Sequence, residues 1–101
     1  MLELVAALHP TPAVGGHPTD AALALQEELE KTERGRYAGP VGWVDRRGNG
    51  AFAVGIRSVS LEGPVARLHA GVGVVADSEP QAELAETRAK AQAMLANLVR
   101  I

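Results

Sequence analysis

The sequence predicts an α+β fold in which a three-stranded antiparallel β-meander is flanked by helices. Apolar residues recur at helical spacing near both ends of the chain, strand-like runs fill the middle, and tight-turn signals separate those runs. A chain of 101 residues can bury one modest core. We therefore expect a single domain spanning residues 1–101.

The first third of the chain is predicted to be helical. Residues 2–8 form the end of a short helix, which the two prolines of the HPTP stretch forbid from continuing. Thr19 is a suitable N-cap for a second helix, over about residues 20–31. Apolar residues follow Thr19 at a spacing of three and four: Ala22, Leu25 and Leu29.

The middle of the chain has the character of strands. VGWV and AFAVGIRSVSL (51–61) are separated by DRRGNG, whose Asn49-Gly50 pair is a hairpin signal. A second turn at Glu62-Gly63-Pro64 precedes VARLHAGVGVV (65–75). Three consecutive strands joined by tight turns predict the antiparallel meander.

A final helix is predicted to run from the turn at Asp77–Pro80 to about residue 99. Its core-facing stripe consists of apolar residues: Leu84, Ala91, Leu95 and Leu98. A second stripe borders the first and carries charge: Glu79, Glu83, Glu86 and Lys90. By spacing alone this charged stripe is either a solvated surface with a favourable Glu86–Lys90 pair or a metal site.

Composition excludes several classes of function. The formal net charge is −2, and no cluster of Lys or Arg is interleaved with aromatic residues, which argues against a nucleic-acid partner. The chain has no Cys, so disulfides, thiolate zinc sites and a Cys nucleophile are excluded. The opening apolar run is too short for a signal peptide or a membrane span, so we expect a cytoplasmic protein with no membrane partner.

Two strand-like runs contain residues suited to binding an anion. Strict alternation over 51–61 places Arg57 among small and apolar residues, and its planar fork suits a carboxylate or phosphate. An internal ion pair, or a strand face open to water, is the simpler explanation of Arg57 by position alone. Gly71 and Gly73 share one face of the next strand, which marks either a bulge or the close approach of backbone or ligand. Together with the glutamates of the final helix, these residues could form a cleft for a small anion and a divalent metal.

A histidine at the start of the HPTP stretch is a further candidate. His9 could serve as a hydrogen-bond donor, a general acid or base, or a metal ligand. More often, a lone histidine beside a proline is a structural cap. The serines lack the glycine-flanked pattern of a nucleophile elbow.

Taken in order, three segments resemble the C-terminal part of the chorismate-utilising enzymes: LHPTPAVGG, GPVGWVDRRGNGAFAVGIRS and LHAGVGVVADSEPQAELAETRAK. The resemblance covers nearly the whole chain and is strongest to the isochorismate synthase branch, with the anthranilate and salicylate synthases as alternatives. It implies that the chain is a C-terminal fragment of a larger chorismate-binding fold. The implied activity is a magnesium-dependent conversion of chorismate to isochorismate.

The same resemblance assigns roles to individual residues. It implies that Glu86 is a ligand of Mg²⁺ and that Glu83 supports the metal through water. It places Arg57 and Lys90 on substrate carboxylates. It also implies that His9 lies near the substrate ring.

The backbone at Gly71 to Gly73 would line the same pocket. The family's lysine base and its glutamic acid, which protonates the departing hydroxyl, have no match in this chain. We therefore expect the isolated chain to be inactive, to need the missing N-terminal part of the enzyme, and to self-associate through an exposed sheet edge and apolar face. A non-catalytic module that binds a small anion and a metal is the alternative, and a purely structural remnant is a third reading.

Overall fold

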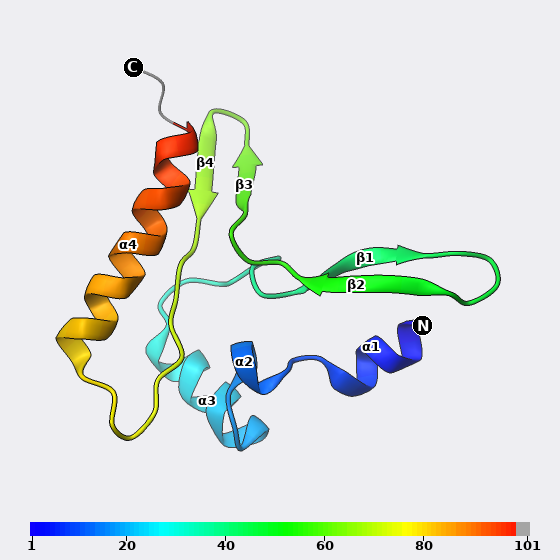
Figure 1. Cartoon of the computed structure of the whole chain (residues 1–101), viewed down its shortest axis with the longest axis horizontal. Coiled ribbons are helices and arrows are strands. Elements are labelled where there is room, and N and C mark those ends of the chain that lie inside the picture. The colour runs from blue at the N-terminus through cyan, green and yellow to red at the C-terminus, as the bar shows by residue number, and fades with distance from the viewer. Residues whose placement is uncertain (99–101) are drawn as a thin grey trace. The chain divides into compact units, whose positions relative to one another are not determined.

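The computed structural model describes residues 1–98, which form helices and two small antiparallel sheets (Figure 1). The elements in chain order are α1 (Leu2–Leu8), α2 (Pro12–Gly15), α3 (Thr19–Leu29), β1 (Pro40–Val44), β2 (Gly50–Val54), β3 (Val59–Glu62), β4 (Val65–Leu68) and α4 (Pro80–Leu98). The chain divides into two compact units, Met1–Gly55 and a second that begins at Ile56. Each unit is described by itself.

In the first unit α1 and α3 agree with the predicted helices, whereas the short helix α2 was not predicted. α1 is confirmed, but the HPTP stretch does not pass directly into a loop, because Pro12 starts the short helix α2. Proline suits the first position of a helix, where its missing N–H would have no intrahelical partner. Thr19 was expected to cap α3, yet it lies inside the helix, and Pro18 occupies the cap position.

Two adjacent glycines let α2 approach its neighbours closely. Gly15 is buried, and a Cβ atom there would lie 3.0 Å from side-chain carbons of Pro10. Gly16 has a φ of 82°, and a Cβ atom there would lie 2.7 Å from the Cβ of Ala22. Gly16 therefore requires glycine for both conformation and space, whereas a side chain at Gly15 would crowd Pro10.

The β1–β2 hairpin is confirmed, with Val44 opposite Gly50 in the register. Its turn comes earlier than the Asn49-Gly50 pair, however. The Asp45 carboxylate accepts hydrogen bonds from the backbone N–H groups of Arg47 (2.8 Å) and Asn49 (2.9 Å), and Gly48 takes the left-handed φ of 86°. These bonds, with Asn49 as the strongest contributor, lower the pKa of Asp45 below its ordinary value.

The predicted three-stranded meander is wrong, because the expected strand over 51–61 is interrupted. Gly55 donates its N–H to the carbonyl of Gly39 (2.7 Å), and Arg57 then adopts a φ of 55°. A left-handed residue cannot continue a strand. The second half of the run therefore forms β3, which pairs with β4 and not with β2, giving two two-stranded sheets.

The last predicted strand is also shorter than expected. The turn at Gly63-Pro64 is confirmed, but β4 ends at Leu68, and residues 69–75 run outside any sheet. The final helix is confirmed as α4, and the expected end near residue 99 lies outside the described residues.

The most covered side of α4 differs from the predicted one. No residue of α4 is fully buried, and the half-buried positions are Glu83, Thr87, Lys90, Ala91 and Met94. The leucines of the predicted stripe remain exposed, from 38% at Leu95 to 42% at Leu84. The covered side thus lies between the apolar stripe and the carboxylate stripe.

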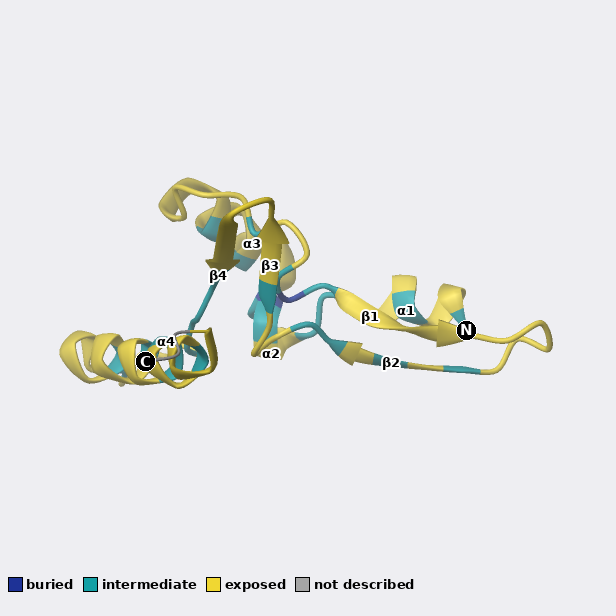
Figure 2. Ribbon diagram, turned by 90° about the horizontal axis from the view of Figure 1, so that it is seen from above, coloured by how far each residue is buried: buried dark blue, intermediate teal, exposed yellow. Residues whose placement is uncertain are grey.

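Few apolar side chains are buried in the described part of the chain. Within residues 1–98, Ala38 is the one buried hydrophobic residue, and most of the ribbon is exposed (Figure 2). Trp43 and Leu8 are 58% and 68% exposed. Such apolar surface is what a polypeptide presents to a partner that covers it.

No helix within residues 1–98 is long and apolar enough to cross a membrane.

Candidate functional site

A cation, a carboxylate and a backbone carbonyl meet in the second unit. The helical step of four residues places Glu86 and Lys90 on one side of α4, and Lys90 Nζ lies 3.1 Å from Glu86 Oε1. The same Nζ donates a hydrogen bond to the carbonyl oxygen of Gly71, at 3.1 Å. The structure therefore brings together three of the residues that the sequence singled out, and it confirms the predicted Glu86–Lys90 pair.

The other two glutamates of the stripe differ in what they do. Glu79 Oε2 accepts the backbone N–H of Ala82 (2.7 Å), so this carboxylate caps the start of α4. Glu83 is half-buried, and its backbone carbonyl accepts the hydroxyl of Thr87 (3.0 Å). The carboxylates of Glu83 and Glu86 are therefore the two that α4 offers for a ligand.

These two carboxylates match the chemistry of magnesium. Mg²⁺ prefers oxygen ligands and is usually bound by one or two carboxylates together with water and substrate oxygens. Within residues 1–98 no three His, Asp or Glu side chains gather in a way that could hold a metal ion. Within the described residues, Glu83 and Glu86 could therefore supply at most two of the ligands that a magnesium ion needs.

The structure changes the setting of Arg57. It was expected on a strand face among apolar residues, but it lies between β2 and β3 with a left-handed backbone and an exposed side chain. It forms no ion pair with any other residue that the structure describes. The strand-face argument is therefore wrong, while the guanidinium remains available to an anion.

Gly71 and Gly73 were predicted to lie on a strand, but they lie outside any strand, because β4 ends at Leu68. The carbonyl of Gly71 is held by Lys90. Gly73 is exposed, and a Cβ atom there would meet nothing within 4 Å in the described structure. Open space beside Gly73 is consistent with either a ligand or another polypeptide approaching its backbone.

His9 lies in the first unit, where it is the C-cap residue of α1. Its backbone N–H donates to the carbonyl of Val5 (2.9 Å) in an extended conformation, and the residue is half-buried. Any residue other than proline could make this backbone bond, so it does not explain why the position is a histidine. Its imidazole remains a candidate for chemistry.

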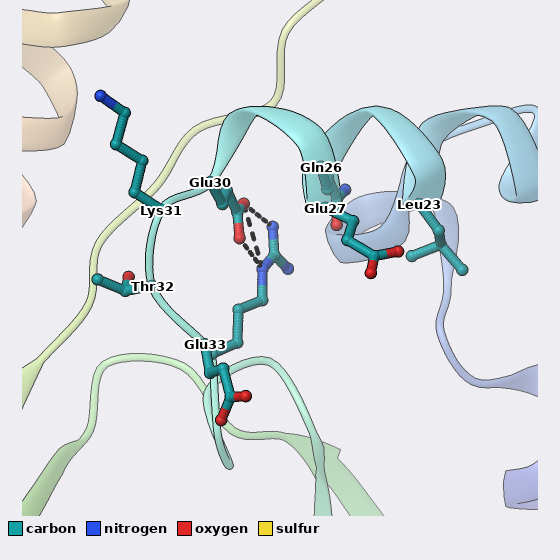
Figure 3. Close-up of a pocket in the computed structure, with 8 residues that line it drawn as sticks. Leu23, Gln26, Glu27, Glu30, Lys31, Thr32 and Glu33 are labelled. Carbon is teal, nitrogen blue, oxygen red and sulfur yellow. Dashed lines mark hydrogen bonds and ion pairs between the residues drawn. The ribbon is translucent and has the colours of Figure 1, made fainter.

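A polar cluster that the sequence did not predict lies at the end of α3, around Glu30 and Gln26 (Figure 3). Arg34 forms an ion pair with Glu30 (2.6 Å) and donates to the carbonyl of Val14 (3.1 Å). Side chains of this region line a hollow of about 340 Å³. The i,i+4 spacing of Glu30 and Arg34 could have indicated the ion pair, but no sequence signal indicates the contact with Val14.

Similarity to known proteins decides the family. A family model described as "Chorismate binding enzyme" matches residues 1–99. The chain belongs to this family. The sequence-based identification is therefore confirmed.

Among chorismate-binding enzymes, the similar relatives are longer than this chain. The isochorismate synthase MenF of Bacillus subtilis is 49% identical over 98 residues, which is 97% of this chain and 21% of the relative. The anthranilate synthase component 1 of Saccharolobus solfataricus is 41% identical over 93 residues, 92% of this chain and 22% of the relative.

A solved structure agrees with these sequence relatives. The putative 2,3-dihydroxybenzoate-specific isochorismate synthase DhbC from Bacillus anthracis matches with a TM-score of 0.91 and 47% identity, over 96% of this chain and 26% of that chain. The chain therefore spans about a fifth to a quarter of the length of its relatives.

Proposed function

We propose that this chain is the C-terminal half-site of a magnesium-dependent isochorismate synthase, which converts chorismate to isochorismate. The observation that carries the proposal is the higher identity to an isochorismate synthase, 49% against 41% for an anthranilate synthase component, over nearly the same stretch. Salicylate or anthranilate formation is the alternative chemistry within the family.

The charges of the second unit support binding of the substrate. Chorismate carries two carboxylates, and Arg57 and Lys90 supply two cations for them. In the structure Lys90 is shared between Glu86 and the carbonyl of Gly71. In the proposed site Lys90 donates to a substrate carboxylate, which leaves Glu86 free to act as a metal ligand.

Magnesium would be held here by Glu86, with Glu83 acting through water. Bound Mg²⁺ supplies a positive charge that neutralises a substrate carboxylate and orients it. The two cationic side chains and the backbone at Gly71 and Gly73 would orient the remainder of the molecule. His9 would lie near the ring and donate a hydrogen bond or a proton to a ring substituent.

The reaction needs groups that this chain does not supply. The resemblance assigns activation of water to a lysine and protonation of the departing hydroxyl to a glutamic acid, both upstream of the matched segments. Because the chain covers 21% of the Bacillus subtilis relative, we expect those groups in the remaining part of a full enzyme. The isolated chain should bind weakly and should not turn over chorismate.

The exposed apolar side chains support the need for that remaining part. On β1, both Val41 (60%) and Trp43 (58%) face solvent, as do the leucines of α1. We propose that the upstream part of the enzyme covers these side chains, and that the isolated chain self-associates instead. Sedimentation velocity of the isolated chain should show oligomers, and a strictly monomeric chain that binds no hydrophobic dye would contradict this.

The decisive experiment uses a completed enzyme, in which this chain replaces the matching 98 residues of the Bacillus subtilis isochorismate synthase. Chorismate is supplied with and without Mg²⁺, and the products are separated by chromatography. Isochorismate that forms only with Mg²⁺ supports the proposal. Salicylate or anthranilate as the main product would overturn the assignment to the isochorismate branch.

A non-catalytic anion and metal module is the second candidate, favoured by one observation: Lys90, Glu86 and Gly71 already meet within a single unit of this chain. In that case the isolated chain would bind chorismate in a magnesium-dependent manner without forming product. The substitutions Glu86→Ala and Arg57→Ala would abolish this binding. If neither ligand binds and the two substitutions change stability alone, the isolated chain is a structural remnant.

A further inference from the structure

We propose that Arg34, together with Glu30 and Gln26, is a positioning group that holds α2 and, through it, His9. The three side chains lie within the first unit, on α3 and directly after it. The functional consequence rests on the proposed function, which places His9 in a chorismate site. The contacts by which these side chains hold α2 do not depend on that function.

The need for such a group follows from the length of α2. A helix of four residues leaves its last carbonyl groups without intrahelical partners and is too short to be stable alone. Gln26 Nε2 donates to the carbonyl of Gly15 (3.1 Å) and, more weakly, to that of Val14 (3.4 Å). Arg34 Nη1 donates to the same carbonyl of Val14 (3.1 Å). Side chains distant in sequence therefore satisfy the C-terminal end of α2.

Arg34 is itself fixed by the rest of the cluster. Its Nε and Nη2 atoms donate to the two carboxylate oxygens of Glu30 at 2.9 Å and 2.6 Å. The guanidinium lies 5.8 Å from the centre of the Tyr37 ring. Arginine stays protonated in proteins, and the hydrogen bond to Glu30 raises the pKa of Arg34 further. The planar guanidinium contacts the Glu30 carboxylate, the Val14 carbonyl and the Tyr37 ring at once. This combination fixes its orientation, and the single ammonium group of a lysine cannot reproduce it.

The position of α2 is transmitted to His9 by direct packing. Gly15 fits against Pro10 so closely that a Cβ atom on Gly15 would lie 3.0 Å from two carbons of that ring. Pro10 follows His9 directly and has a fixed φ. If the end of α2 moves, Pro10 loses its support, and the backbone that carries His9 moves with it.

The first test measures hydrogen exchange of the full 101-residue chain by mass spectrometry. The amides of Gly15 and Gly16 donate to Thr11 and Pro12, so peptides covering 10–17 report on α2. Arg34→Lys should accelerate exchange there about tenfold, because one charge-assisted hydrogen bond is lost locally. Exchange in the β1–β2 hairpin should be unchanged, and Arg46→Lys, which alters an exposed arginine of the hairpin turn, is the matched control.

Two outcomes of this test overturn the positioning role. Equal acceleration throughout the chain would mean that Arg34 contributes only general stability. Absence of protection at 10–17 in the unsubstituted chain would mean that the cluster does not hold α2. Neither outcome depends on catalysis, so neither is confused with failure of the proposed function.

The second test uses the completed enzyme. Arg34→Lys and Gln26→Leu should each lower kcat about tenfold with little change in KM for chorismate, since small misplacement of a reacting group costs rate more than binding. A rise in KM with unchanged kcat would overturn the link from α2 to His9. If the unsubstituted completed enzyme shows no turnover, the proposed function fails, while the exchange result still decides whether Arg34 positions α2.

Discussion

The two units of the molecule use similar side-chain arrangements with different chemistry. In the first, Arg34 pairs with the glutamate four residues earlier and also holds the carbonyl of Val14. In the second, Lys90 pairs with the glutamate four residues earlier and also holds the carbonyl of Gly71. Each cation thus joins one carboxylate to the backbone of a glycine-containing segment.

The difference between the two cations indicates what each arrangement can do. Arg34 engages Glu30 through two nitrogens, one of them at 2.6 Å, and a third nitrogen reaches the backbone. Lys90 makes both of its contacts at 3.1 Å through a single rotatable ammonium group. A guanidinium held by several hydrogen bonds suits a structural role, whereas an ammonium group can exchange one oxygen partner for another. This is why we assign positioning to Arg34 and ligand binding to Lys90.

The largest effect should come from the carboxylate partner of Lys90. Glu86→Gln in the completed enzyme should lower kcat about a thousandfold, because a bound metal supplies several kcal/mol of charge stabilisation. Isochorismate formation measured against Mg²⁺ concentration checks this. The control is Glu28→Gln, an exposed glutamate of α3. Retention of magnesium-dependent turnover by Glu86→Gln would remove Glu86 from the metal site.

The next effect should come from Lys90 itself. Lys90→Gln should raise KM for chorismate by about ten- to a hundredfold, since a hydrogen bond between charged groups is worth about 1.5 to 3 kcal/mol. Initial rates over a range of chorismate concentrations measure this. If KM is unchanged while the protein becomes less stable, the pair with Glu86 is structural, as in the first unit.

Substitutions at two glycines, one in each unit, test the same contrast between a structural role and ligand binding, with smaller expected effects. Gly16→Ala should destabilise the completed enzyme by about 1 to 3 kcal/mol, because a left-handed residue other than glycine is strained and its Cβ would press against Ala22. Gly73→Ala meets no neighbour in the described structure and should leave stability unchanged while weakening chorismate binding. Urea unfolding and KM together check both. Equal destabilisation by the two substitutions would contradict the contrast.

The smallest effect concerns Asp45 in the hairpin turn. Its pKa is lowered in the folded chain, so the charged form stabilises the turn above the ordinary carboxyl pKa, and that contribution is lost as the pH falls through the lowered pKa. The amide resonances of Arg47 and Asn49 should shift over this acidic range and not near neutral pH. Asp45→Asn should abolish the acid-dependent shift.

Local signals predicted most of the elements. Apolar spacing predicted α3 and α4, and the prolines of HPTP predicted the end of α1. The glycine-containing turns predicted both hairpins, although the first turn lies before Asn49-Gly50. The Glu86–Lys90 pair followed from helical spacing alone. These features depend on residues close in sequence, where propensity and spacing act directly.

The features that were missed depend on distant residues. α2 is held by side chains of Gln26 and Arg34, eleven or more residues away from the carbonyls that they bind. The break in the predicted strand arises at Arg57, where alternation continues through a left-handed backbone that non-glycine residues rarely adopt. The contact of Lys90 with Gly71 spans nineteen positions. No local pattern in the sequence encodes these contacts.

The scarcity of buried apolar side chains has a calorimetric consequence. Globular proteins gain about 12 to 15 cal/mol/K per residue in heat capacity on unfolding, mainly from apolar surface that becomes hydrated. A chain in which Ala38 is the one buried hydrophobic residue within 1–98 has little such surface left to hydrate. Its thermal transition alone should be broad, with a small heat-capacity step. Joining the chain to the upstream part of the enzyme should instead give a strongly negative heat-capacity change, whose size measures the apolar area that the two parts cover.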